Sequence, residues 1–246
     1  MPRPKLQFRI HLLYVHMHQD IMKMDPRYRA VCFDMDGTLL NTKVDYGKMA
    51  DVVFDEMVKI GVPEDVIDRN SGYKFNLESG INYLISHGRI DDVHKAGRNA
   101  WKGARDIEME RVNEAVPFEG SLNLLKRIHA LGLRTGLLTR GCREYAEAAT
   151  KICGVYDELD SIVARDDYSE QEAKPSPKAM EHIAERLNVS PEEILYFGDH
   201  LFDYQCARDS GAGFIAVLTG TYTREDWGKE DVVIYDSVTD FYKNLE

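Results

Sequence analysis

The sequence predicts an α/β fold, a Rossmann-like parallel sheet core with an inserted helical cap domain. In the second half of the chain, short apolar segments alternate with amphipathic helices, which is typical of a parallel sheet covered on both faces. A first apolar segment at Ala30 is separated from the others by a long block of helical periodicity. We therefore assign residues 30–42 and 117–246 to the core and residues 43–116 to the cap.

The core elements are short and bounded by turn or capping residues. We expect strands at 30–33, 134–139, 162–164, 194–197, 214–218 and 232–234. We expect helices at 122–131, 144–153 and 201–208. The pair Ser176-Pro177 marks another helix start, with serine as the N-cap and proline in the first turn. Ser190, followed by Glu193, has the spacing of a capping box.

The block from Val44 to Val116 has only helical patterns, so we expect no strand in it. In its first helix, apolar residues recur at spacings of three and four from Met49 to Ile60. The run Gly61-Val62-Pro63 ends that helix.

Residues 1–29 form an N-terminal extension that is a candidate for disorder. It is basic and contains three histidines, which are weak metal-ligand candidates, and Met22 or Met24 is an alternative start. It lacks the longer apolar core and the cleavage site of a targeting peptide. We assign it no part in the function.

Composition limits the classes of partner. The 246 residues carry a net charge of -11, which argues against nucleic acid or an acidic membrane surface as the partner. No apolar run approaches the roughly 18 residues of a membrane span. Four cysteines without a CxxC pair favour a cytoplasmic location and no structural zinc. We expect a monomer or a homodimer that acts on a small molecule.

A pair of acids follows the first predicted strand, in the segment Asp34-x-Asp36-Gly37-Thr38. Two carboxylates at the end of a buried strand are costly unless a cation holds them, and Gly37 permits a tight reversal. The alternative is an ordinary Asx-type turn after a strand, because Asp-Gly is a common turn pair.

Three further elements follow predicted strands or precede a helix. Thr139 and Arg140 end one strand, Lys174 precedes the helix start at Ser176, and Asp199 ends another strand with Asp203 one helical turn later. Capping of the next helix would explain Thr139 or Asp199 alone, and a surface position would explain Lys174. Capping does not explain Asp203. Because open α/β sheets bind ligands at the carboxyl ends of their strands, we expect these residues to meet there.

These four elements, in this order, resemble the four motifs of the haloacid dehalogenase (HAD) superfamily of phosphatases. The resemblance extends from Ala30 to about Leu218, and the helical insert lies where that superfamily has its type 1 cap. It implies that Asp34 is a nucleophile that forms an aspartyl-phosphate, and that Asp36 is the general acid and base. Thr139 and Lys174 would hold the phosphoryl group.

The resemblance also implies a Mg²⁺ cofactor, held by Asp34, Asp199 and the backbone carbonyl of Asp36. Asp203 would bind the ion through water or orient Lys174. Hard oxygen ligands suit this ion. Haloalkanoate dehalogenases typically lack the second aspartate, so Asp36 favours phosphate esters over halides as substrates.

Phosphoglycolate is the first expectation for the substrate, and Arg69, Lys74 and Arg140 are candidates for binding its second anionic group. Hydrolysis of a nucleotide, a sugar phosphate or pyrophosphate stays open, as does a β-phosphoglucomutase-like mutase that uses the same aspartates. An alternative of another class is a non-catalytic regulator that binds a phosphorylated ligand.

Overall fold

Six short strands pair into one parallel sheet in the computed structural model, which describes residues 24–245. The order across the sheet is β5-β4-β1-β6-β7-β8, and every neighbouring pair is parallel. The strands are β1 (Ala30–Phe33), β4 (Arg134–Leu138), β5 (Ser161–Val163), β6 (Ile194–Gly198), β7 (Gly213–Val217) and β8 (Val233–Tyr235). The predicted parallel α/β core is confirmed.

Strand β1 lies in the middle of the sheet, and its four residues are fully buried. Its last residue, Phe33, is in register with Leu137 of β4 and Phe197 of β6. The rings of Phe33 and Phe197 stack with their centroids 5.1 Å apart. The next backbone N–H, that of Asp34, donates to the Phe197 carbonyl at 2.8 Å. The central strand thus delivers Asp34 to the carboxyl edge of the sheet.

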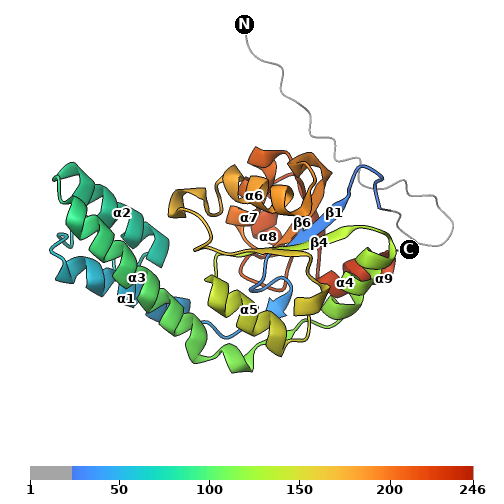
Figure 1. Cartoon of the computed structure of the whole chain (residues 1–246), viewed down its shortest axis with the longest axis horizontal. Coiled ribbons are helices and arrows are strands. Elements are labelled where there is room, and N and C mark those ends of the chain that lie inside the picture. Colours follow the sequence, from blue (N-terminus) through green and yellow to red (C-terminus); the bar gives the residue numbers. More distant parts are fainter. Residues whose placement is uncertain (1–23, 246) are drawn as a thin grey trace, which may run out of the picture. The chain divides into compact units, whose positions relative to one another are not determined.

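Helices cover both faces of this sheet. They are α4 (Ser121–Ala130), α5 (Arg143–Ile152), α6 (Pro177–Leu187), α7 (Leu201–Ser210), α8 (Arg224–Trp227) and α9 (Val238–Asn244). Helices α6 and α7 pack on each other on one face, and α4 and α9 pack on each other on the other face (Figure 1). Short 3-10 turns are η1 (Val112–Glu114), η2 (Tyr156–Glu158), η3 (Glu170–Glu172) and η4 (Pro191–Glu193).

Two predicted start signals are present in the structure. Ser176 is the N-cap of α6, with Pro177 in the first turn. Ser190 and Glu193 form the expected capping box, but the segment that it opens is the single turn η4. Strand β6 begins directly after that turn, so the chain has no room for a longer helix there.

The chain divides into two compact units. One runs up to Asn41 and resumes at Val116, and the other spans Thr42–Ala115. The second unit consists of α1 (Tyr46–Lys59), α2 (Tyr73–Ser86) and α3 (Ile90–Glu110). The three helices share a core of their own, whose fully buried members include Val53, Met57, Leu77, Leu84, Ala96 and Ala100.

A two-stranded antiparallel pair, β2 (Leu40–Asn41) and β3 (Val116–Pro117), lies where the chain leaves the first unit and returns to it. The expectation of no strand up to Val116 is therefore wrong at its last residue. Two-residue strands contain no periodic pattern, and this pairing joins residues that are far apart in the sequence.

The N-terminal extension is only partly described by the structure. Its first 23 residues, with the three histidines and the alternative start Met22, lie outside the described residues. The last part of the extension belongs to the core: Tyr28 is buried, and Arg29 exchanges backbone hydrogen bonds with Glu193 and Arg134. The ordered core thus begins before Ala30.

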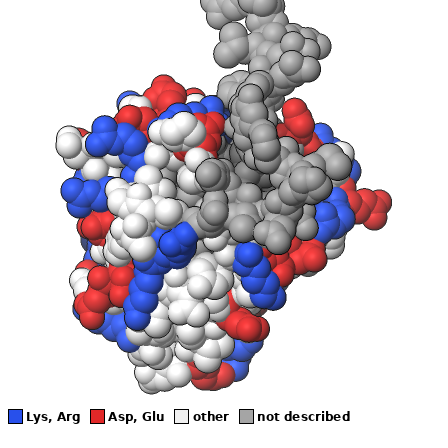
Figure 2. Space-filling view, turned by 90° about the vertical axis from the view of Figure 1, so that its right-hand side faces the viewer, with Lys and Arg blue, Asp and Glu red and all other residues white. Residues whose placement is uncertain are grey.

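None of the helices in the described part of the chain combines the length and the apolar character that a membrane crossing requires. On the face shown in Figure 2, Lys and Arg side chains are interspersed with Asp and Glu, with uncharged surface between them. The net charge of -11 is therefore not gathered into a single acidic field on that face.

Candidate active site

Residues from four separate segments meet at the carboxyl edge of the sheet. Asp34 follows β1, Thr139 follows β4, Asp199 follows β6, and Lys174 precedes α6. All four are buried, with at most 7 % of the surface of each exposed. Charged and polar groups with so little water around them need partners within the protein.

The ammonium group of Lys174 is the centre of this cluster. Its Nζ donates to Asp34 Oδ1 at 2.5 Å, to Asp203 Oδ1 at 2.6 Å and to the Tyr196 hydroxyl at 2.9 Å. Burial alone would disfavour the charged amine, but the attraction of Asp203 and Asp34 outweighs it and raises the pKa of Lys174. Lys174 therefore stays protonated at neutral pH.

Asp34 is a buried carboxyl in a strongly charged environment. Burial raises its pKa well above the ordinary value, the Lys174 cation opposes that rise, and Asp203 and Asp199 add to it. With one lysine among three carboxylates, ionisation of all three leaves negative charge that the described side chains of the cluster do not balance. Such a pocket is suited to a cation or to a group that carries one with it.

Asp34, Asp199 and Asp203 form a group that could hold a metal ion. One carboxylate oxygen from each lies within 4.8 Å of the others, and all three residues are buried. Burial and the nearby Asp203 raise the pKa of Asp199 to about 6. The three oxygen donors are hard ligands, which fit Mg²⁺ rather than a thiolate-seeking metal. The side chain of Asp36 is not a member of this group.

Both carboxylate oxygens of Asp199 have hydrogen-bond donors from other segments. The Thr38 hydroxyl donates to Oδ1 at 3.1 Å, and the Thr221 N–H donates to Oδ2 at 2.9 Å. The loop after β7 approaches so closely that a Cβ atom on Gly220 would lie 1.8 Å from Asp199 Oδ2. A glycine at this position leaves room for the carboxylate. These contacts hold Asp199 in one orientation, as hydrogen bonds to a metal-binding carboxylate do.

The turn after Asp36 depends on Gly37, which has a φ of +82°. Its N–H donates to the Leu40 carbonyl at 2.9 Å, and its own carbonyl accepts from the Thr219 hydroxyl at 2.6 Å. The left-handed backbone is strained for residues with a side chain. Gly37 thus allows the chain to reverse close to the carboxylate of Asp199.

The hydroxyl oxygen of Thr139 accepts a hydrogen bond from the Gly141 N–H at 2.9 Å. Its backbone N–H donates to Val163 across to β5. Accepting through the oxygen is compatible with donating the hydroxyl proton to a ligand. Thr139 and Lys174 line the same small cavity.

Arg140 is directed at the loop that carries Lys174. Its guanidinium donates to the backbone carbonyl of Lys174 and, at 2.6 Å, to Glu170 Oε1. Both side chains of the Arg140–Glu170 ion pair are largely buried. These contacts fix the backbone of the catalytic-lysine candidate. The predicted role of Arg140 in substrate binding stays a prediction.

Arg69 and Lys74 belong to the helical unit, and both have partners within it. Arg69 pairs with Asp51 at 3.1 Å and with Asp55 at 2.5 Å, and Lys74 lies 3.5 Å from Glu78. Their contact with substrate stays a prediction.

Two further side chains, which the sequence did not single out, contact the expected site residues. The Tyr145 hydroxyl donates to Asp36 Oδ1 at 2.6 Å, and the Tyr196 hydroxyl lies between Lys174 and Asp203. Tyr196 is in the apolar strand β6 and Tyr145 is in an amphipathic helix, so the sequence pattern predicts that each is a residue of the hydrophobic core. Neither has a local signal that separates it from a packing residue.

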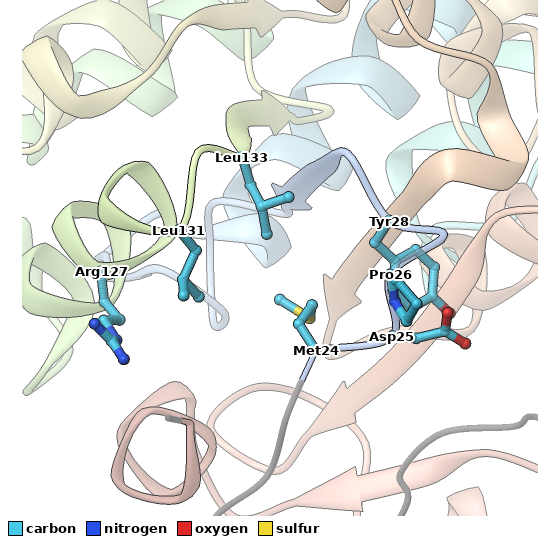
Figure 3. Close-up of a pocket in the computed structure, with 7 residues that line it drawn as sticks. All are labelled: Met24, Asp25, Pro26, Tyr28, Arg127, Leu131 and Leu133. Carbon is cyan, nitrogen blue, oxygen red and sulfur yellow. The ribbon is translucent and has the colours of Figure 1, made fainter.

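A second hollow, of about 520 Å³, lies at the opposite end of the sheet. It is lined by Met24, Asp25, Pro26, Tyr28, Arg127, Leu131 and Leu133, whose side chains Figure 3 shows around it. Tyr28 and Leu133 precede the first residues of β1 and β4, so this hollow lies at the amino ends of the strands. Parallel sheets bind their ligands at the carboxyl ends, where the acidic cluster is.

The chain is similar in sequence to known hydrolases and phosphatases. The family model of the haloacid dehalogenase-like hydrolases matches residues 28–211. A phosphoglycolate phosphatase of Thiobacillus denitrificans is 29 % identical over 195 residues, which cover 78 % of this chain and 84 % of that protein. An N-acetylmuramic acid 6-phosphate phosphatase of Pseudomonas putida is 28 % identical, covering 84 % of this chain and 92 % of that protein.

Solved structures show the same fold. The crystal structure of a haloacid dehalogenase-like hydrolase from Bacteroides fragilis superposes with a TM-score of 0.61 at 22 % identity, covering 87 % of this chain and 99 % of that chain. The family model covers both sides of the helical insert and every strand up to β6. The chain belongs to the haloacid dehalogenase-like hydrolase family.

Proposed function

We propose that this hydrolase is a Mg²⁺-dependent phosphatase that cleaves a small phosphorylated metabolite through an aspartyl-phosphate on Asp34. The observation that carries the proposal is the buried contact of Lys174 with both Asp34 and Asp203, beside Asp199. A carboxylate that is held by a buried ammonium group next to a metal-binding cluster is suited to attack a dianionic phosphate. The two relatives named above, both phosphatases, support the same reaction class.

In the first half of the reaction, a carboxylate oxygen of Asp34 forms a bond to phosphorus as the bond from phosphorus to the leaving oxygen breaks. Asp36 passes its proton to that oxygen, so the product leaves as an alcohol. Lys174 neutralises the charge of Asp34, and the Thr139 hydroxyl donates to a phosphoryl oxygen. Asp34, Lys174 and Thr139 are buried, which limits the access of bulk water to the nucleophile.

In the second half, water attacks the phosphorus atom of the aspartyl-phosphate. Asp36, now a carboxylate, takes the proton from this water, and the electron pair of the breaking bond returns to Asp34. Inorganic phosphate leaves, and both aspartates regain their starting protonation states. Two displacements replace one difficult displacement.

The residues that would hold the metal are Asp34 and Asp199, with the backbone carbonyl of Asp36 and, directly or through water, Asp203. When bound, Mg²⁺ would neutralise carboxylate and phosphoryl charge and polarise the phosphorus–oxygen bonds. The unbalanced negative charge of the buried triad supports this ligand set.

Phosphoglycolate is the first candidate substrate, and the phosphoglycolate phosphatase of Thiobacillus denitrificans supports it. A sugar phosphate is the second candidate, which the N-acetylmuramic acid 6-phosphate phosphatase of Pseudomonas putida supports. A nucleotide or pyrophosphate would use the same nucleophile. Choice among them rests with groups outside the cluster described above, for which Arg69, Lys74 and Arg140 are the candidates.

The test compares hydrolysis of p-nitrophenyl phosphate by the wild type, Asp34→Asn and Asp209→Asn, each with Mg²⁺ and with EDTA. Asp209 is a matched control, because it is an exposed aspartate in α7 whose partner is the neighbouring Arg208. We expect wild-type and Asp209→Asn turnover only with Mg²⁺, and no turnover by Asp34→Asn. Wild-type turnover equal to that of Asp34→Asn would overturn the proposal.

A panel of phosphate esters, headed by phosphoglycolate and hexose phosphates, then ranks substrates by kcat/KM. A mutase would retain phosphate on Asp34 and return a phosphorylated isomer, whereas a phosphatase releases inorganic phosphate. Release of one phosphate for each ester consumed therefore argues against the mutase.

A further inference from the structure

The buried side chain of Tyr145 makes a direct contact with Asp36. Tyr145 lies in the first turn of α5, and only 1 % of its surface is exposed. Its hydroxyl donates to Asp36 Oδ1 at 2.6 Å, which is a short distance for a hydrogen bond between two oxygens. The two residues are 109 positions apart in the sequence. The contact brings a rigid aromatic donor to the carboxyl group that carries the reaction's proton in the mechanism above.

The ring of Tyr145 has little freedom to move away. A Cβ atom on Gly141 would lie 2.8 Å from Tyr145 Cδ1, so the glycine lets the ring approach the backbone of the loop after β4. The same loop places the Gly141 N–H on the Thr139 hydroxyl. On the other side, the backbone of Asp36 is held by its bridge to Leu40. Helix and loop together fix the donor and the acceptor.

The hydrogen bond from Tyr145 engages the Oδ1 atom of Asp36. A phenol donates one proton, and Oδ1 accepts it both when the carboxyl group is ionised and when it carries its own proton on Oδ2. The contact therefore persists through both halves of the reaction, in which Oδ2 gives and takes the proton. General acid catalysis requires this orientation, because the proton must point at the leaving oxygen.

We propose that Tyr145 is a positioning residue that holds Asp36 in the orientation for proton transfer from Oδ2. The inference rests on the proposed phosphatase function and adds a residue to it. If the hydroxyl instead served only to fill the core, phenylalanine would replace tyrosine with a uniform effect on all substrates. The two roles therefore differ in how the loss depends on the leaving group.

The test measures kcat/KM of Tyr145→Phe with p-nitrophenyl phosphate and with an alkyl phosphate, both at saturating Mg²⁺. This ratio reports the first half of the reaction and leaves out the hydrolysis of the aspartyl-phosphate, which both esters share. Nitrophenolate leaves without a proton, whereas an alkoxide requires one. Because general acids contribute about 10²–10⁴-fold, we expect loss of orientation to lower kcat/KM for the alkyl ester about tenfold or more. We expect kcat/KM for the nitrophenyl ester to change less than about threefold.

Tyr28→Phe is the matched control, since Tyr28 is also buried and its hydroxyl contacts only the neighbouring Arg27 among the hydrogen bonds of the described residues. We expect it to keep the wild-type ratio of the kcat/KM values for the alkyl and nitrophenyl esters. Asp36→Asn should show the same selective loss as Tyr145→Phe, and a larger one. Thermal midpoints verify that each variant is folded.

Equal losses of kcat/KM for both esters in Tyr145→Phe, or no loss, would overturn this inference while the wild type still turns over, so the proposed function would stand. A wild type without turnover above Asp34→Asn would overturn both.

Discussion

Among the described residues, Lys174 and Arg69 are cations that each contact two aspartates, and they belong to different units of the chain. Lys174 contacts Asp34 and Asp203 and is 3 % exposed. Arg69 contacts Asp51 and Asp55, and 52 % of its side chain is exposed. The charges and distances are similar, but the surroundings differ.

The two cations differ in how much their ion pairs contribute to stability. Water screens Arg69 and both of its partners, so its ion pairs contribute little to the free energy of unfolding. If one partner is lost, water solvates the remaining charge. Around Lys174, a buried charge without a partner would destabilise the fold. Segments of the core that are distant in the sequence supply the partners of this lysine. A cation between two aspartates therefore indicates a candidate catalytic site when all three groups are buried, and not when they are exposed.

The largest contrast should appear when each cation is replaced by methionine. Lys174→Met should lower kcat by about 10²–10³-fold, the usual effect of losing one charge-stabilising group. It should also destabilise the fold by about 3–5 kcal/mol at pH 7, because two buried carboxylates lose their partner. Phosphatase assays and urea unfolding measure the two effects.

Arg69→Met is the matched variant, and its unfolding midpoint should stay near that of the wild type. If Arg69 binds substrate, only KM should rise. A loss of stability as large as that of Lys174→Met would contradict the comparison.

The second contrast concerns pH and metal. The pKa of Asp199 is raised from 3.8 to about 6, so its stabilising contribution is complete below 3.8 and is lost as the pH rises through about 6. In EDTA at pH 8, Asp199→Asn should therefore be more stable than the wild type, by on the order of 3 kcal/mol. With Mg²⁺ the order should reverse, because only the wild type gains stability from binding.

Urea unfolding at pH 8 and pH 4, with and without Mg²⁺, measures this reversal. In EDTA the two proteins should converge at pH 4, where Asp199 is protonated. A variant that is less stable than the wild type in EDTA at pH 8 would contradict the argument that burial disfavours the Asp199 carboxylate.

The smallest effects on stability are expected when two glycines, Gly220 and Gly97, are each replaced by alanine, and the two effects should have opposite signs. An added methyl group on Gly220 would meet Asp199, so Gly220→Ala should cost about 1–3 kcal/mol and weaken Mg²⁺ binding about 10–100-fold. In the helical unit, Gly97 of α3 has open space around it, and Gly97→Ala should stabilise by about 0.5–1 kcal/mol.

Calorimetric Mg²⁺ titration and thermal unfolding of both glycine variants make this test. Unchanged Mg²⁺ affinity in Gly220→Ala would show that the loop after β7 does not position Asp199.

Much of the fold could be predicted because its signals are local. Each core strand is a short apolar run between turn residues, and the start of α6 is marked by a serine and a proline. The pair β2–β3 could not be predicted, because two residues form no period and their partners lie on either side of the insert. The capping box of Ser190 and Glu193 is such a local signal, and it opens the single turn η4 directly before β6.

The sequence alone determined which residues follow the strands. The carboxyl ends of parallel strands share one edge, and so the positions of Asp34, Thr139 and Asp199 after β1, β4 and β6 were enough to predict that they lie near one another. Only the tertiary structure decided what each of them touches. The Tyr145 contact with Asp36 and the approach of Gly220 to Asp199 join distant segments, and no local pattern records them. Burial, which makes Lys174 differ from Arg69, is likewise a property of the packed chain, because it depends on what the other segments exclude from water.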